Sequence, residues 1–231
     1  MSPVSAEMAK HALNAFLATS LSFINDIADL CEKTGADILD VSKALRLDPR
    51  IGPKAYLDAG LGFSGGTLGR DLKSLIQVAK ENDIDVSIVE SVFKKNKLRR
   101  NIVVHHINKE LGGLEGKIVA IFGLTYKAGT STLSRSLSLE IAKDLKNSRA
   151  ILQLYDPMGE REDILRDPYE AANGSVALVL MTPWPEFKNL DFLRLRKSMK
   201  DPAIFLDTRN FLYDKESYLR SLGFRYFGVG R

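Results

Sequence analysis

The chain has 231 residues, of which 45% are apolar and 27% charged, so it can bury one large core or two ordinary ones and is not a disordered protein. The basic residues behind its net charge of +4 are spread out, apart from the run "KKNKLRR" at 94–100, which we interpret as a solvated helix face rather than a nucleic-acid site. No apolar stretch approaches the roughly 20 residues of a membrane-spanning helix, and no N-terminal signal pattern is present. We therefore expect a cytoplasmic protein without a nucleic-acid or membrane partner.

The first half of the chain reads as helical. Apolar residues at a period of 3.6 predict one long amphipathic helix over residues 5–33, with Gly35 as its stop. Further helices are expected from about Asp37 to just before Asp48, over 70–83, and as one long helix across 85–113. Cys31 is the single cysteine, which excludes an internal disulfide and a multi-cysteine metal site, and its apolar neighbours predict a buried core thiol. We predict no metal site.

From Gly112 onward the pattern changes to short apolar runs closed by Gly, Pro or Asp. Four such runs predict strands at 117–124, 150–157, 175–183 and 203–210. Continuous rather than alternating apolarity indicates strands buried on both faces, as in a parallel sheet covered by helices. The predicted fold is therefore an all-helical domain at 1–113, followed at 114–231 by a doubly wound, Rossmann-like α/β domain that binds its ligand at the carboxyl ends of its strands.

The turn after the first predicted strand reads "GLTYKAGT" at 123–130. It does not fit the G-x-G-x-x-G pattern of dinucleotide sites. It instead places Lys127 and a Gly129-Thr130 pair ahead of a helix, which suits one anionic group better than a whole NAD. We therefore expect no cofactor-binding residue in this turn.

Several segments together carry a family resemblance. They are "AEMAKHALNAFLATSLSFINDIADLC", "DPRIGPKAYLDAGLGFSGG", "GLTYKAGT", "LYDP", "DTRN" and "GFRYFGVGR". In this order they resemble the central helix, the substrate loop and the nucleotide-binding landmarks of the UDP-glucose/GDP-mannose 6-dehydrogenase family. The resemblance implies an NAD-dependent oxidoreductase of polysaccharide biosynthesis, which oxidises the 6-hydroxymethyl group of a nucleotide-linked hexose twice to a carboxylate.

The family's E-x-x-K-x-x-x-N helix falls on Glu7, Lys10 and Asn14. Lysine and asparagine four residues apart share a helix face. The resemblance therefore implies that both aim at one oxygen, where the ammonium stabilises developing alkoxide charge and the amide orients the oxygen or a water. The alternative is that Lys10 is a solvent-facing lysine.

The family's G-G-S-C-F-P-K-D loop is altered here. Thr67 stands at the position of the nucleophilic cysteine and Arg70 at that of the lysine, while Asp71 is kept. A threonine hydroxyl, whose pKa lies far above neutral, substitutes poorly for a thiolate that must carry a thioester. We expect the second oxidation to fail, whereas a first oxidation to the aldehyde needs no covalent step.

The resemblance also implies a set of substrate-binding residues. They are Arg50, Phe63, Gly65, Gly66, Lys127 and Arg209. Arg50 would act from the partner subunit of a homodimer built on the long helix, and two cations with exposed loop amides suit a diphosphate. The family's D-D-x-R motif is absent, because residues 131–134 read "STLS", which is expected to weaken binding of a UDP-sugar. The segments "RIGPK" and "YDP" favour UDP over GDP.

The family's NAD-binding domain would precede residue 5, where only "MSPV" stands. We therefore expect no NAD on this chain and no oxidation by the chain alone. Three hypotheses follow: a part of such an enzyme that binds the nucleotide sugar and dimerises; an active oxidoreductase completed by a separate NAD-binding domain or chain; and a scaffold that has lost its ligand. The first hypothesis predicts binding without turnover, the second predicts turnover once a partner is added, and the third predicts neither.

Overall fold

The computed structural model of the protein describes residues 1–64 and 66–231. The described chain forms two compact units, Met1–Arg99 with Gly230–Arg231, and Arg100–Val229. We expected the boundary between residues 113 and 114. The observed boundary follows Arg99, so the last helix before the sheet belongs to the second unit. Among the described residues, every helix is too short or too polar to cross a lipid bilayer.

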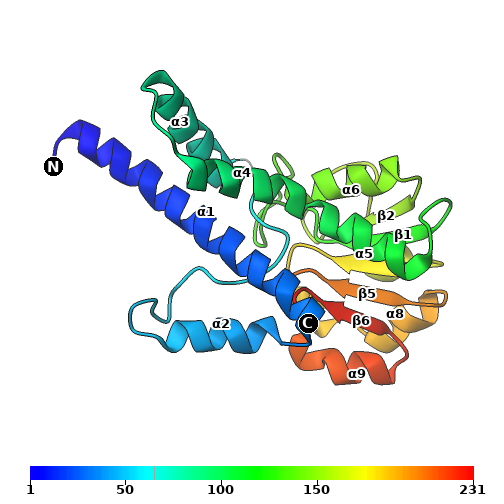
Figure 1. The fold of residues 1–231 in the computed structure, drawn as a ribbon. Coiled ribbons are helices and arrows are strands. Elements are labelled where there is room, and N and C mark those ends of the chain that lie inside the picture. The colour runs from blue at the N-terminus through cyan, green and yellow to red at the C-terminus, as the bar shows by residue number, and fades with distance from the viewer. Residues whose placement is uncertain (65) are drawn as a thin grey trace. The chain divides into compact units, whose positions relative to one another are not determined.

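The first unit is helical, as predicted (Figure 1). Its helices are α1 (Pro3–Thr34), α2 (Ile38–Leu47), α3 (Leu68–Glu81) and α4 (Ser87–Arg99). The Ser2 side chain caps α1 by accepting from the N–H of Ser5, and Gly35, with φ 76°, ends the helix in the left-handed conformation that glycine adopts without strain. The predicted ends of α1 and α2 are confirmed to within a few residues.

Helix α1 buries small side chains together with Leu21 and Ile24, and it leaves several large apolar side chains exposed. Ala15 and Ala18 pack in a core cluster with Leu72 of α3 and Val92 of α4, and Cys31 is buried as predicted. Small side chains let neighbouring helices approach closely, because little side-chain volume separates the two backbones. Of the large apolar residues that follow the 3.6 period, Ile24 is buried, whereas Met8, Phe16 and Leu30 are exposed.

The prediction of one long helix across 85–113 is wrong. Helix α4 ends at Arg99 and a separate helix, α5 (Asn101–Leu111), follows after Arg100. No glycine or proline marks the break in the sequence. The two helices have different packing partners, since α4 contacts α1 and α3 whereas α5 contacts α6 (Leu137–Asn147). Tertiary packing therefore interrupts the helix.

The second unit is a six-stranded sheet in which every pair is parallel, as predicted. Its strands are β1 (Ile118–Phe122), β2 (Ile151–Tyr155), β3 (Ile164–Leu165), β4 (Ala177–Leu180), β5 (Ile204–Asp207) and β6 (Arg225–Gly228). Its other helices are α7 (Pro168–Ala172), α8 (Phe192–Ser198) and α9 (Glu216–Ser221), with short 3-10 helices at Pro185–Asn189 and Tyr213–Lys215. The edge strands β3 and β6 escaped prediction, because β3 is two residues long and β6 alternates between buried and less buried positions.

The order of the strands fixes where a ligand is expected. The sheet runs β3-β2-β1-β4-β5-β6, so the chain winds outward in one direction from β1 and then in the other from β4 (Figure 1). In doubly wound sheets, ligands bind at the carboxyl edge beside such a reversal of strand order, next to the loops that follow these two strands. Strands β4 and β5 are buried along their whole length, which gives this edge a rigid base.

Candidate functional site

In the first unit, α1 and α3 bring two predicted catalytic residues together. Asp71 lies in the first turn of α3 with only 1% of its surface exposed. The Asn14 amide donates a 2.5 Å hydrogen bond to Asp71 Oδ2, and Arg70 Nε donates to Oδ1 at 3.1 Å. The bond from Asn14 lowers the pKa of Asp71 against the opposing effect of burial. The site therefore holds a buried carboxylate that is ionised at neutral pH.

His11 also faces this carboxylate, and sequence reasoning missed it. Its Nδ1 lies 3.7 Å from Asp71 Oδ2 and is buried without a hydrogen-bond partner among the described residues. The available signal was spacing, since His11 lies three residues before Asn14 and so on the same face of α1. The cluster thus combines a carboxylate, an amide and an imidazole, which are groups able to orient a hydroxyl and accept its proton.

Two other predicted catalytic residues lie at the surface. Lys10 is exposed, and none of the described contacts brings its ammonium to Asp71. Thr67 precedes the first residue of α3, and its exposed side chain makes no capping hydrogen bond. Gly66 lies in the turn before Thr67, whereas Gly65 is outside the described residues.

Arg50 and Phe63 are occupied within the first unit. Arg50 is exposed and pairs with Asp48, with Nη2 2.6 Å from Oδ2, and this bond lowers the pKa of Asp48. The Phe63 side chain is 7% exposed and packs in the cluster with Leu72. Asn96 hydrogen-bonds both backbone groups of Phe63, so the described contacts of Phe63 are structural.

In the second unit, the two predicted cations lie on loops at the same edge of the sheet. Lys127 is exposed on the loop that follows β1. Arg209 is half-buried after β5, and its backbone N–H donates to Asp207 Oδ1 at 3.1 Å. Because carboxyl ends of parallel strands meet at one edge, both cations project from the side where the sheet is expected to bind.

Asp156, which follows β2, ties three of these loops together. Its Oδ2 accepts from the backbone N–H groups of Leu124 and Thr125, at 2.6 and 2.9 Å, and from the indole N–H of Trp184 at 3.2 Å. Its Oδ1 accepts from the N–H groups of Met158 and Gly159 at 3.0 and 2.7 Å. One buried carboxylate therefore fixes the turns after β1, β2 and β4.

Asp207 does the same for the loop that carries Arg209. It is completely buried at the end of β5, and its Oδ2 accepts from Leu212 N–H at 2.7 Å and from the Tyr226 hydroxyl at 2.9 Å. Burial raises the pKa of Asp207, while these donated bonds oppose that shift. The backbone that presents Arg209 is therefore held in place.

The residues of the second unit do not fit NAD. In dinucleotide-binding sheets an acidic side chain after β2 binds the ribose hydroxyls, but here the oxygens of Asp156 already accept five bonds from backbone N–H groups and an indole, together with the Thr125 hydroxyl. The turn after β1 also lacks the glycine pattern.

A single anion fits the same edge better. Helix α6 begins after the Lys127 loop, and no side chain caps its first turn. The hydroxyl of Ser136, at the cap position, is buried and has no hydrogen-bond partner among the described residues. Uncapped amides and an unpartnered donor at a helix N-terminus favour a phosphate.

Two family models match consecutive parts of the chain. Residues 4–98 match the central domain of the UDP-glucose/GDP-mannose dehydrogenase family and residues 120–214 match its UDP binding domain. The chain is 40% identical to a UDP-glucose 6-dehydrogenase of Rickettsia bellii, with 98% of this chain and 54% of the relative aligned. It is also 40% identical to the enzyme of the same name from Rhizobium meliloti, over 98% of this chain and 53% of that relative.

Solved structures show the same fold. A UDP-glucose dehydrogenase from Pyrobaculum islandicum superposes with a TM-score of 0.86 at 28% identity, covering 100% of this chain and 52% of that one. The chain spans about half the length of the curated relatives it matches. On the two consecutive domain matches and these relatives, the chain belongs to the UDP-glucose/GDP-mannose dehydrogenase family.

Proposed function

We propose that this chain is the central and UDP-binding portion of a UDP-hexose 6-dehydrogenase and that it binds a UDP-sugar. The main observation in support of binding is at the carboxyl edge of the sheet. Lys127 and Arg209 lie there on loops that Asp156 and Asp207 hold in place. Two cations and an uncapped helix N-terminus on loops at the same edge of the sheet favour a diphosphate. The first unit separately carries the Asn14–Asp71 pair, which the family resemblance assigns to catalysis.

The same residues support binding more strongly than oxidation. Hydride transfer needs an acceptor, and the turn after β1 does not fit NAD, because Asp156 is already saturated with donors. Thr67 supplies a hydroxyl where the family resemblance implies a thiolate. We therefore propose that the chain alone binds its ligand without turning it over.

Calorimetric titration of the purified chain tests this proposal. UDP and UDP-glucose are expected to bind with micromolar affinity and GDP more weakly. Lys127→Ala is expected to reduce the affinity for UDP by about tenfold, because it removes a charge-assisted bond to phosphate. Lys117→Ala is the matched control, since this exposed lysine precedes β1 at the opposite end of the strand. Absence of heat with every ligand in the wild-type protein would contradict binding and favour the scaffold hypothesis.

The retained Asn14–Asp71 pair supports a second candidate function. A carboxylate held ionised by an amide, with His11 beside it, is chemistry that a binding scaffold does not require. In this candidate a separate nicotinamide-binding domain completes the enzyme, and Thr67 limits it to the first oxidation. Turnover after addition of such a domain distinguishes it from the binding-only proposal.

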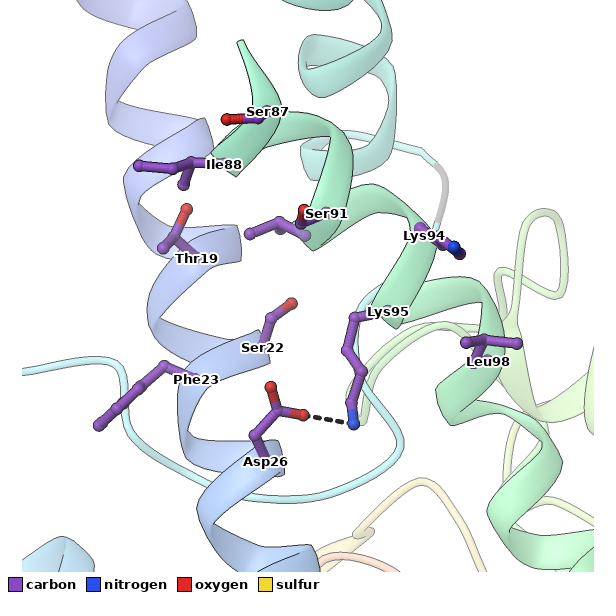
Figure 2. Close-up of a pocket in the computed structure, with 11 residues that line it drawn as sticks. Thr19, Ser22, Phe23, Asp26, Ser87, Ile88, Ser91, Lys94, Lys95 and Leu98 are labelled. Carbon is purple, nitrogen blue, oxygen red and sulfur yellow. Dashed lines mark ion pairs between the residues drawn. The ribbon is translucent and has the colours of Figure 1, made fainter.

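We further propose that two copies of the chain associate through α1. Its exposed apolar residues recur at intervals of seven or eight, which places Met8, Phe16, Phe23 and Leu30 in one stripe. Beside the stripe, a cavity of about 580 Å³ lies between α1 and α4. Figure 2 shows Phe23 and Ile88 at this cavity, with Lys95 paired to Asp26 across it. An apolar stripe of this kind is typical of an interaction surface.

Sedimentation equilibrium checks this association. The wild-type chain is expected to sediment as a dimer, and Phe16→Glu, at a side chain 72% exposed, as a monomer, because it places a charge in the apolar stripe. Leu193→Glu is the control, since it makes the same kind of change at an exposed leucine of the second unit. A wild-type monomer at micromolar concentration would be incompatible with the proposal.

A further inference from the structure

Four backbone groups of the segment Gly60–Phe63 are hydrogen-bonded by side chains. The N–H of Gly60 donates to Asn25 Oδ1 at 2.8 Å, and its carbonyl accepts from Arg99 Nε at 2.8 Å. The N–H of Phe63 donates to Asn96 Oδ1, and its carbonyl accepts from Asn96 Nδ2, both at 2.8 Å. One asparagine thus satisfies both polar groups of Phe63 in the way that a neighbouring strand would.

The arginine in this set is buried. Arg99 is only 4% exposed, pairs with Asp29 of α1 and also reaches the Asn25 carbonyl at 3.4 Å. Burying a guanidinium is costly unless its hydrogen bonds and its charge are matched. The Asp29 carboxylate matches the charge and the Gly60 carbonyl accepts from Nε, whereas Nη2 is buried without a hydrogen-bond partner among the described residues. Arg99 therefore links the segment to both α1 and α4.

Gly62 shows how closely the segment lies against α4. Its φ is +90°, and a Cβ at this position would lie 2.3 Å from Asn96 Oδ1. The backbone can take this path only because residue 62 has no side chain. The glycine and the asparagine are therefore two parts of one contact.

We propose that Asn96, with Arg99 and Asn25, is a positioning clamp for the glycine-rich loop. The clamp fixes the backbone at Gly60–Phe63, immediately ahead of Gly66 and Thr67 and of the helix that carries Asp71. These three side chains do not touch the ligand; they set where the loop begins. The inference rests on the proposed function, because it assigns the clamped loop to the sugar.

Asn96→Ala tests the clamp directly. Hydrogen exchange at the Phe63 amide is expected to accelerate at least about tenfold, because the amide loses its acceptor. Affinity for UDP-glucose is expected to fall about tenfold while affinity for UDP stays within about twofold, because only the sugar depends on the loop. Asn96→Asp keeps the acceptor for the Phe63 N–H but loses the donor to its carbonyl, and it is expected to fall between wild type and Asn96→Ala in both measurements.

Asn108→Ala is the matched control, because this asparagine is exposed on α5 in the second unit, and neither measurement is expected to change. A merely structural asparagine would lower stability and leave the ratio of UDP-glucose to UDP affinity unchanged, which would overturn the proposal. Unchanged exchange at Phe63 would also overturn it. If the wild-type chain binds neither ligand, the proposed function fails, and the exchange measurement alone decides whether the clamp exists.

Discussion

Replacing Asp156 with alanine is expected to lower the free energy of unfolding by about 3–5 kcal/mol, because removing one side of a buried, hydrogen-bonded charge leaves its partners unpaired. The orphaned donors would include the N–H groups of Leu124 and Thr125 and the indole of Trp184. Urea unfolding measures the change, followed by the fluorescence of Trp184, the single tryptophan.

Asp214→Ala is the control for this experiment, because Asp214 is exposed in a short 3-10 helix. A surface substitution of this type is expected to change stability by less than about 0.5 kcal/mol. If Asp156→Ala cost no more than the control, the carboxylate would not be the link between the three turns.

Gly123→Ala is the second change with a large expected effect. Gly123 has φ +86°, and a Cβ there would lie 2.3 Å from the Thr182 carbonyl oxygen and 2.6 Å from the Thr182 nitrogen. Both clashing atoms belong to the backbone after β4, so neither can rotate away as a side chain could. We expect a loss of about 3 kcal/mol or more, from backbone strain and overpacking together.

Gly129→Ala separates these two causes in the same loop. Gly129 has φ +78°, but nothing lies within 4 Å of the place that a Cβ would take, so only the left-handed conformation is penalised, at about 1–2 kcal/mol. Thermal unfolding of both variants gives the comparison. Equal losses of stability in the two variants would show that the close approach of the turns after β1 and β4 does not contribute to the effect of Gly123→Ala.

The sequence predicted the sheet well because burial on both faces leaves a direct mark. The runs at 117–124, 150–157, 175–183 and 203–210 each contain an observed strand, since a strand covered by helices on both faces must be apolar throughout. Strand β6 left a weaker mark, because its Arg225 is exposed at the edge of the sheet. The break at Arg100 left no such mark, because it depends on the packing of α4 against α1 and α3 and of α5 against α6, which the periodicity within 85–113 does not report.

The candidate site was predictable only where the spacing was local. Asn14 and Asp71 are 57 residues apart, so periodicity could not pair them, and the family resemblance named both as catalytic without predicting their 2.5 Å contact. His11 could have been found on the same helix face. The role of Asp156 could not, because it depends on three loops that meet only once the parallel strands are aligned. The clamp at Phe63 likewise needs Asn96, which lies 33 residues later.

The last two residues have a consequence for the order in which the chain is made. Gly230 and Arg231 belong to the first unit: the Gly230 N–H donates to Glu32 at 2.8 Å, its carbonyl accepts from Ile38 N–H at 3.0 Å, and Arg231 pairs with Asp37. A ribosome completes these contacts only after it has made the whole sheet. The helical unit therefore cannot complete the hydrogen bonds at the junction between α1 and α2 until the last strand of the sheet has also been synthesised.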